Sequence, residues 1–432
     1  MSRIIVTLAL VFVCAACSDS ASNADAKSPT PDGGGDAARD SAADAPAREA
    51  GADVGAEAVP PAPDGPRPDY NAAPNPKLAG LGDGDAIDLG AFGCTSPGAG
   101  DGTCTRVTDY SGFTFDPNNH QFLMFGGGHS TTMTDSVFAF DLASSLTWKE
   151  LYAPTPCSQM VASNLDPTTG AWKAGPAGPY PRPLAAHTYD LLAFAPAQNA
   201  FVLISRLFNG GYCSSVGNDV GGPVAHFDLG ANTWSFSSVS AASGSNIDAA
   251  EYDPVSKKIL IFGRSGLGYY DPAQRSWSLA VSTYNGDKLK TSQGADADMN
   301  ALGYANHMVY LPSTDTFYYF VRGGGDVYAL KLDRTDLTKS TLDRVTTSGS
   351  APTHGEPGYA VDTQNNIIGG AVKDSMFYVF DPAGASWSAH ALGGSPGTQA
   401  FHAIGYDPVN NVFIFITDGS SGAHTWAFRY KN

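Results

Sequence analysis

Three stretches of this sequence repeat one pattern: FTFDPNNHQFLMFGG from Phe113, AEYDPVSKKILIFGR from Ala250 and IGYDPVNNVFIFITD from Ile404. Each stretch begins with an aromatic-rich segment, turns at Asp-Pro and continues into a strongly apolar segment. Proline presets a turn, and asparagine or aspartate tolerates its φ angles, so each stretch is typical of a β-hairpin. Weaker copies begin at Leu192, Met308 and Tyr359.

A second hairpin follows most copies of the first. Its third segment ends in Asp-Leu or Asp-Pro and its fourth carries a tryptophan, as in SVFAFDLASSLTWKEL and LGYYDPAQRSWSL. Successive turn markers lie 45 to 79 residues apart, which fits a four-stranded unit with loops of variable length. Such a unit cannot bury both faces alone, so the units stack in a ring. We predict an all-β fold, a β-propeller with six blades, and a seventh blade is possible in residues 152–185.

The last copy stops at HTWAFRYKN, after its third strand. Residues 85–92 form a short strand-like run with no hairpin of their own. We therefore expect this N-terminal run to supply the missing fourth strand and to close the ring.

The glycines at 126–128 and 323–325, the tryptophan six residues after Asp-Leu, and Pro181-Arg182-Pro183 before His187 resemble kelch repeats. The resemblance covers about residues 80–432. It implies the kelch-type propeller fold but no single activity, because kelch propellers include oxidases, epimerases, lyases and binding modules.

The N-terminus reads as an export signal. Residues 1–17 carry Arg3, an apolar run and small residues before Cys17, which fits a signal peptide. Cys14-Ala15-Ala16-Cys17 resembles the bacterial lipobox, which implies that Cys17 is acylated. Plain secretion and an uncleaved anchor are the alternatives. Ser18 favours the outer membrane or cell surface over the inner membrane.

Residues 18–78 follow as a segment rich in Ala, Asp, Ser, Gly and Pro. Residues 18–70 hold 11 acidic and 4 basic residues and hardly any large apolar side chain. Such a segment cannot offset its ordering entropy, so we expect a disordered tether before a propeller at 79–432. An acidic binding tail is the alternative.

The charge balance argues against one class of partner. The chain carries Lys+Arg 25 against Asp+Glu 42, a formal net charge of −17, and no basic stripe of the kind that a nucleic acid needs. We expect a monomer that meets the membrane only through its lipid.

Four cysteines remain outside the signal region. An even number in an exported chain favours two disulfides. Cys94–Cys104 is the local pairing and would leave Cys157–Cys213, but all three pairings are open, and a catalytic thiol is the alternative. The four residues are Cys94, Cys104, Cys157 and Cys213.

The histidines gather on one predicted face of the ring. Strands alternate within a blade, so the loop before strand one and the loop between strands two and three share a face. Six of nine histidines fall there: His129, His187, His307, His354, His402 and His424. Tyrosines and arginines join them, and Arg206, Arg264 and Arg322 follow second strands in equivalent positions. The candidate ligand-binding residues are His187, Tyr212, Arg264, Tyr304, His307, Arg322, His402 and His424, with Tyr110 also at this face. The alternative interpretation is that these side chains satisfy backbone groups and neighbouring acids.

Two functions fit this face. One is a module that binds a glycan or a protein. The other is a polysaccharide lyase acting on a uronate polymer, which needs a base and a carboxylate-neutralising cation. GGGH at 126–129 and HTYD at 187–190, with Arg206, resemble the ulvan lyase propellers. The resemblance implies that His129 is base or acid, Tyr189 its partner and Arg206 the neutralising group.

A metal ion is a further possibility. Histidine clusters bind zinc or copper, and Asp296-x-Asp298-x-Asn300 is similar to the start of a calcium loop. His307 stands at the twelfth position, which excludes an EF-hand, so structural zinc or a looser calcium site remain open.

Overall fold

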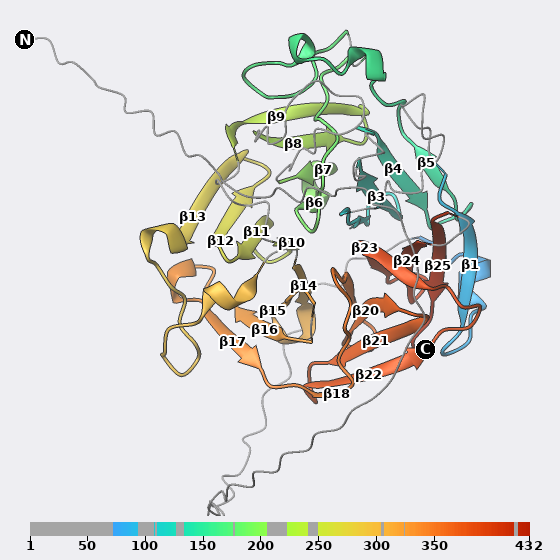
Figure 1. The fold of residues 1–432 in the computed structure, drawn as a ribbon, viewed down its shortest axis with the longest axis vertical. Helices are drawn as coiled ribbons and strands as arrows, with labels where there is room; N and C mark the ends of the chain where they lie inside the picture. The colour runs from blue at the N-terminus through green and yellow to red at the C-terminus, as the bar shows by residue number, and fades with distance from the viewer. Residues whose placement is uncertain are drawn as a thin grey trace, which may run out of the picture. The chain divides into compact units, whose positions relative to one another are not determined.

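The structure is a computed structural model that describes residues 72–93, 108, 110–126, 134–175, 178–204, 223–240, 249–303, 306–323, 325–418 and 422–432. These residues form six β-sheets arranged in a ring (Figure 1). The predicted all-β, six-bladed propeller is therefore confirmed. Kelch membership stays a resemblance.

In blades one to five, four consecutive strands run outward from the axis in chain order. Blade one is β2 (Thr114–Asp116), β3 (Gln121–Phe125), β4 (Val137–Asp141) and β5 (Trp148–Glu150). Blade two is β6 (Leu192–Ala195), β7 (Ala200–Leu203), β8 (Pro223–Asp228) and β9 (Thr233–Ser240). Blade three is β10 (Ala249–Asp253), β11 (Lys258–Gly263), β12 (Gly266–Asp271) and β13 (Ser276–Ser282).

Blades four and five repeat this order, and blade six takes its outermost strand from the N-terminal side of the ring. Blade four is β14 (His307–Leu311), β15 (Thr316–Phe320), β16 (Val327–Lys331) and β17 (Thr341–Val345). Blade five is β19 (Tyr359–Asp362), β20 (Ile367–Lys373), β21 (Met376–Asp381) and β22 (Ser386–Ala391), with β18 (Ser348–Gly349) added parallel to β22. Blade six is β23 (Thr398–Asp407), β24 (Val412–Asp418), β25 (His424–Phe428) and β1 (Ala86–Ala91).

Helices are short and lie in the connections. They are α1 (Pro76–Ala79) and the 3₁₀-helices η1 (Cys157–Gln159), η2 (Ala162–Asn164), η3 (Pro196–Gln198), η5 (Thr283–Asn285), η6 (Met299–Leu302), η7 (Pro312–Thr314) and η8 (Leu337–Lys339). Within the described ranges, no helix has the length and apolar character needed to cross a membrane.

The aspartate of each clear repeat holds the first hairpin turn. Asp116 Oδ1 accepts hydrogen bonds from the backbone amides of Asn118 and Asn119, at 2.9 and 3.2 Å, and Asp407 accepts in the same way. The residue before the second strand then takes a left-handed conformation, as His120 does at φ 49°. The repeated Asp-Pro motif therefore encodes the turn through its side-chain oxygen and its fixed φ.

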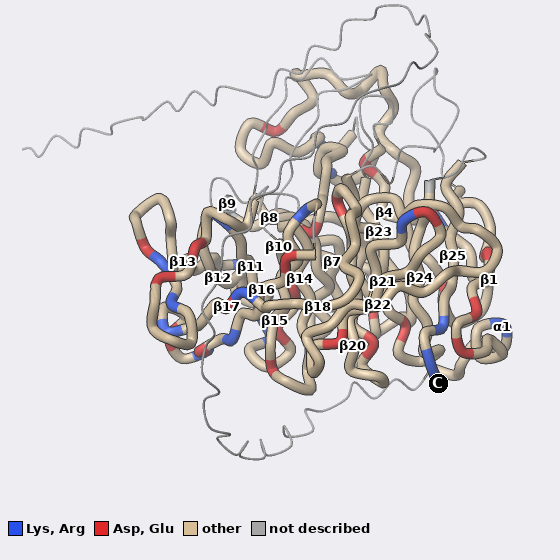
Figure 2. The backbone as a smooth tube through the Cα atoms, turned by 60° about the horizontal axis from the view of Figure 1, so that its bottom comes forward, with Lys and Arg blue, Asp and Glu red and all other residues tan. Residues whose placement is uncertain are grey.

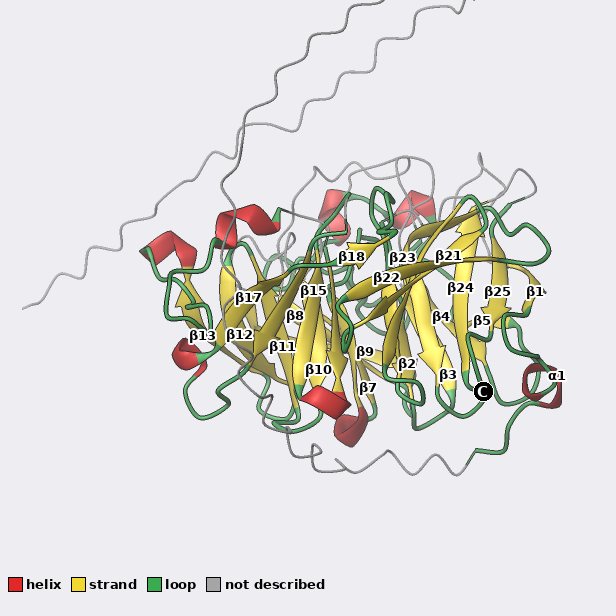
Figure 3. Cartoon of the chain, turned by 90° about the horizontal axis from the view of Figure 1, so that it is seen from below, coloured by secondary structure: helices red, strands yellow, loops and turns green. Residues whose placement is uncertain are grey.

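The core consists of six wedges between neighbouring blades. Phe122 of blade one packs with Ile414 of blade six in one cluster, and Phe125 packs with Phe201 of blade two in the next. Equivalent clusters join each remaining pair of blades. Each blade therefore buries both faces only because the ring is closed, and Figure 3 shows the strands standing side by side around it.

The ring closes through the N-terminal strand, as predicted. β1 pairs antiparallel with β25, and Ala86 lies opposite Phe428. Arg429 fixes the same seam, because its guanidinium donates to the carbonyls of Leu78 and Asn410 at 2.9 and 2.7 Å.

The described residues of 152–185 do not form the seventh blade that was possible there. The described residues of this stretch contain η1, η2 and isolated bridges of Trp172 with Leu165 and with Arg182. Trp172 is buried, so the tryptophan that seemed to lack a hairpin anchors an irregular excursion between β5 and β6. The ring already closes with six blades and leaves no gap for another.

The innermost strands surround the axis. β2, β6, β10, β14, β19 and β23 each contact the next strand around the ring, and β23 contacts β2. Side chains from strands that are not neighbours in this circle can therefore meet only across the channel. Figure 2 shows lysines and arginines interspersed with acidic residues over the blades.

Candidate functional site

Three polar side chains from alternate blades meet at the axis; we call them the axial cluster. His307 begins β14, Asp190 precedes β6 and His402 lies in β23. His307 Nδ1 lies 3.3 Å from Asp190 Oδ1 and 3.3 Å from His402 Nδ1. Blades two, four and six thus each contribute one group, and together the groups bridge the channel.

The axial cluster is held by the backbone as well as by its own contacts. Asp190 Oδ2 accepts a 2.8 Å hydrogen bond from the amide of Met308 in blade four, while the Asp190 carbonyl accepts one from Ala250 in blade three. The imidazoles of His307 and His402 stack with ring centroids 5.6 Å apart. Asp190 therefore joins three blades at one point.

Burial makes the axial cluster neutral. It raises the pKa of Asp190 well above its ordinary range, and the nearby carboxyl of Glu251 adds to the effect. It lowers the pKa of His307 to about 3 and that of His402 well below the ordinary value. The desolvation free energy of a charge here exceeds the stabilisation that neighbouring groups provide, so the two imidazoles are uncharged at neutral pH. The Nε2 atom of His402 is buried and has no hydrogen-bond partner in the described structure.

A second carboxyl faces the same region. Glu251 lies in β10, and burial raises its pKa to about 8. Glu251 and Asp190 thus give the channel two carboxyls that favour the protonated, hydrogen-bond-donating form.

The segment before β19 adds a histidine of defined tautomer. His354 Nε2 lies 3.1 Å from the carbonyl of Gln399, and the amide of Glu356 donates to His354 Nδ1 at 3.2 Å. A carbonyl only accepts and an amide only donates, so the proton of His354 resides on Nε2. Burial lowers the pKa of His354, which keeps this neutral form.

One arginine reaches this region. Arg322 Nη2 lies 3.1 Å from Glu356 Oε1, and its Nε donates to the carbonyl of Gly355 at 3.3 Å. The side chain of Arg322 is 34% exposed, while that of Glu356 is buried.

Four rings gather beside the axial cluster; we call them the aromatic mouth. The Tyr110 ring lies 4.5 Å from His187, 5.7 Å from Tyr189 and 4.4 Å from Phe401. The Tyr189 ring also lies 6.1 Å from His402. Tyr110, Tyr189 and Phe401 are partly exposed.

The aromatic mouth is built on unusual backbone. Tyr110, Tyr189 and Phe401 all have positive φ, at 57°, 46° and 43°. Each such residue costs roughly 1–3 kcal/mol and persists only where its surroundings fix it. Gly112 provides room for this arrangement, because a Cβ there would lie 2.7 Å from the Tyr189 carbonyl oxygen.

The predicted ligand-binding residues, and Tyr189 of the predicted catalytic residues, divide into groups. His187, Tyr189, His307, Arg322 and His402 lie around the channel with Tyr110. Arg264 is exposed in the β11–β12 turn, and no hydrogen bond, ion pair or ring contact in the described structure joins it to them. His424 lies at the outer side of blade six, where its Nδ1 is 2.9 Å from Asp88 Oδ2 of β1.

Several other predicted residues lie outside the described residues. They are His129, Arg206, Tyr212, Tyr304, Cys17, Cys94, Cys104 and Cys213. Cys157 is disulfide-bonded. The disulfide pairing, the catalytic roles of His129, Tyr189 and Arg206, and the lipidation of Cys17 therefore stay predictions.

Sequence reasoning missed the acidic side of the channel. Asp190, Glu251 and Glu356 were not among the predicted site residues, nor was Phe401. A signal existed for Glu251: it stands two residues before the turn aspartate, where the other clear repeats carry Thr114 and Gly405. A charged residue in an innermost strand is unusual unless it has a partner or a role.

Metal ligands do not converge in the described structure. Among those residues, no group of three or more His, Cys, Asp or Glu side chains could hold a metal ion. Asp296 of the calcium-like stretch pairs with Lys288 and Lys290, and Asp298 caps η6 through the amide of Asn300.

The comparisons with known proteins concern the fold. No protein-family model and no curated protein matches the sequence. The chain is similar to a protein of unknown function from Bacteroides thetaiotaomicron, with a TM-score of 0.45 and 10% identity over 80% of this chain and 75% of that chain. It is similar to an auxiliary nutrient binding protein from Bacteroides ovatus, with a TM-score of 0.45 and 12% identity over 80% and 77%. A fungal alcohol oxidase in complex with copper gives a TM-score of 0.41 and 11% identity over 74% and 61%.

Proposed function

We propose that this propeller is a binding module whose aromatic mouth and axial cluster take a glycan. The aromatic mouth carries the proposal, because partly exposed rings on fixed backbone suit stacking against sugar faces. Neutral imidazoles and carboxyls beside them offer hydrogen bonds to hydroxyl groups without a charge mismatch. A protein ligand is the alternative occupant of the same face.

A glycan array followed by titration calorimetry tests this proposal. Tyr189→Ala removes a ring from the aromatic mouth and should weaken binding of the best glycan at least tenfold. Tyr284→Ala, at a tyrosine that is 70% exposed outside the mouth, is the matched control and should change nothing. Equal affinities for the two variants, or an array with no glycan bound, would remove the proposal.

A second candidate function is β-elimination on a uronate-containing polysaccharide. Tyr189 favours it, because its ring lies 5.8 Å from His187 and 6.1 Å from His402, and Arg322 supplies a cation nearby. A tyrosine or an uncharged imidazole can remove the proton next to the carboxylate, and a guanidinium can stabilise the resulting charge. The trio His129, Tyr189 and Arg206 belongs to this hypothesis.

The lyase hypothesis has a direct assay. Uronate polysaccharides are added to the protein, and the ultraviolet absorbance of the unsaturated product is followed. His129→Ala should abolish turnover. If the unaltered protein gives no absorbance change across a broad panel but still binds glycan, the lyase hypothesis is rejected and the binding module remains.

The proposed setting is the outer membrane or cell surface of a bacterium, with a monomeric propeller held by a lipid on Cys17. The sequence of residues 1–17 supports this. Cys17→Ala should shift the protein from the membrane fraction to the soluble exported fraction; an unchanged distribution would contradict a lipid anchor.

A further inference from the structure

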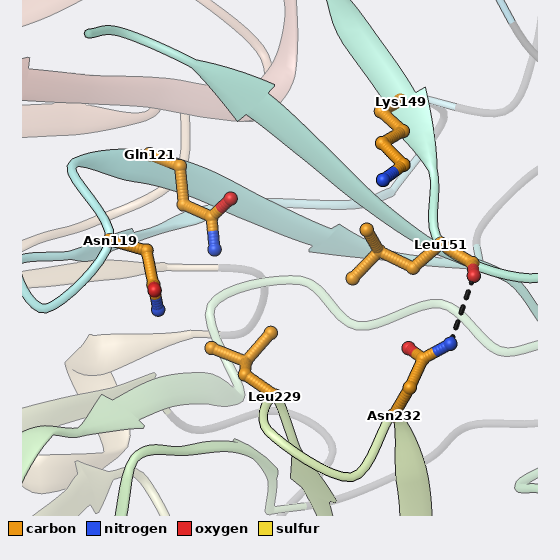
Figure 4. Close-up of a pocket in the computed structure, with 6 residues that line it drawn as sticks. All are labelled: Asn119, Gln121, Lys149, Leu151, Leu229 and Asn232. Atoms are coloured by element: carbon orange, nitrogen blue, oxygen red, sulfur yellow. Dashed lines mark hydrogen bonds between the residues drawn. The ribbon is translucent and has the colours of Figure 1, made fainter.

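A cleft lies between the outer parts of blades one and two, away from the channel; we call it the side cleft. Its first part is a cavity of about 260 Å³ between β3, β5 and the β8–β9 turn. Figure 4 shows Gln121, Lys149 and Asn232 extending toward this common space. The lining residues are Asn119, Gln121, Lys149, Leu151, Leu229 and Asn232.

The side cleft continues into a second cavity of about 200 Å³. Asn232 lines both cavities, and Tyr152 of the second directly follows Leu151 of the first. The second part adds Tyr180, which is 50% exposed, and the guanidinium of Arg182. Together the two cavities reach the size of small-molecule sites, about 300–1,000 Å³.

The amide groups of the first cavity have only their donors engaged within the protein. Asn119 Nδ2 and Gln121 Nε2 both donate to Asp116 Oδ2 at 2.8 Å, and Asn232 Nδ2 donates to the Leu151 carbonyl at 3.0 Å. In the described structure no donor bonds to the three amide oxygens. The cavity therefore presents acceptors, which suit the hydroxyl groups of a ligand.

Two cations line the side cleft without an ion-pair partner among the described residues. Lys149 is exposed on β5, and its neighbour Glu150 faces the other side of the strand because side chains alternate. Arg182 lies over the Tyr152 ring, 4.3 Å from its centroid, and donates to the Ala153 carbonyl.

Acidic groups lie near these two cations, but none forms an ion pair with them among the described residues. Asp116 lies behind the first cavity, but it is buried and already accepts bonds from Asn118, Asn119 and Gln121. Asp135 lies near the second: burial raises the pKa of its carboxyl, while the charge of Arg182 lowers it, so the two groups attract each other. Elsewhere, by contrast, the cations of Lys258, Lys288, Lys290, Arg334 and Arg344 pair with carboxylates.

We propose that the side cleft binds an acidic oligosaccharide. The amide oxygens of Asn119, Gln121 and Asn232 accept hydrogen bonds from its hydroxyl groups. Lys149 and Arg182 meet its carboxylate or sulfate groups, and the exposed ring of Tyr180 stacks on a sugar face. This second site is separate from the aromatic mouth and does not rest on the function proposed for it.

Titration calorimetry of the full chain tests this proposal, with an oligogalacturonate as the anionic probe and a maltohexaose as the neutral one. We expect the oligogalacturonate to bind and the maltohexaose to bind at least tenfold more weakly. Lys149→Met should weaken oligogalacturonate binding about tenfold, and the loss should shrink at high salt as screening grows. Lys331→Met, at an exposed lysine of blade four, is the matched control and should leave the affinity unchanged.

Three outcomes would overturn the proposal. Equal affinity of Lys149→Met and Lys331→Met would show that the cation is not a contact. Displacement of the sugar by oligoglutamate at equal concentration would make the occupant an acidic peptide. Loss of oligogalacturonate binding in Tyr189→Ala would move the site to the aromatic mouth. An unchanged Tm confirms that Lys149→Met folds, and Tyr180→Ala serves as the second variant because its side chain is half exposed.

Discussion

The Nδ1 atoms of His307 and His402 lie 3.3 Å apart, although their strands belong to blades four and six, which are not neighbours in the ring. Contact between them crosses the central channel. With Asp190 from blade two on the other side of His307, the channel is spanned by uncharged polar groups. The aromatic mouth lies beside this cluster, because the Tyr189 ring is 6.1 Å from that of His402.

Glu251 should make the protein less stable as the pH rises. Its folded pKa of about 8 exceeds the ordinary 4.5, so the folded state holds a proton that the unfolded state has lost between these values. The free energy of unfolding then falls with rising pH, by at most about 1.4 kcal/mol per unit for one group. Glu251→Gln should flatten this fall in urea unfolding at pH 5, 6.5 and 8; an unchanged slope would contradict the burial of its charge.

His226 should make the protein less stable as the pH falls into the acid range. Burial lowers its pKa to about 4, and its Nε2 lies 2.6 Å from the Tyr270 hydroxyl in blade three. The folded state therefore binds fewer protons than the unfolded state between about pH 6.5 and 4, and stability is lost as the pH falls through that window. His226→Gln keeps a polar partner for Tyr270 but does not titrate. We expect its Tm to fall less than that of the unaltered protein between pH 7 and 4.5.

Arg429 should be among the costliest single residues to replace at the ring seam. Its buried guanidinium donates to the carbonyls of Leu78, Leu81 and Asn410, at 2.7 to 2.9 Å. Arg429→Met leaves buried acceptors without donors, which should cost about 3 kcal/mol or more. Arg275→Met, which removes a solvent-exposed bond to Ser235, should stay within about 0.5 kcal/mol in the same denaturation experiment.

A side chain at position 112 should disturb the aromatic mouth and weaken glycan binding. A Cβ at this position would lie 2.7 Å from the Tyr189 carbonyl oxygen and 3.3 Å from His402 Cβ. Gly112→Ala must therefore displace the aromatic mouth, with a lower Tm and at least a tenfold loss of affinity for the glycan found on the array. Gly393→Ala, where a Cβ meets nothing within 4 Å, is the control. Unchanged glycan affinity in Gly112→Ala would show that the aromatic mouth is not the binding site.

The hairpins could be predicted because their determinants are local. Asp116 and Asp407 cap turns whose amides lie two and three residues away, so the motif and its structure share one short stretch of chain. The closing strand was predictable for a related reason: the last copy lacks a fourth strand, and Ala86–Ala91 is an extended run without a partner of its own.

The candidate site was predictable only in part. His307 and His402 were found because their place at the start of an innermost strand follows from the repeat. Asp190 was not, because its carboxylate bonds to Met308, 118 residues later in the chain, and no local pattern encodes a contact across the ring. The missing seventh blade has a similar origin, since Trp172 alone does not distinguish a blade from a loop anchored by one buried ring.

The pairing of β1 with β25 has a consequence for how the molecule is made. Blade six needs residues from both ends of the folded region, so a nascent chain cannot complete it until the last strand has been synthesised. Until then the wedges beside blade six are open, and two strand edges are free to pair with other chains. Completion of the ring thus depends on one late event, the pairing of its first strand with its last.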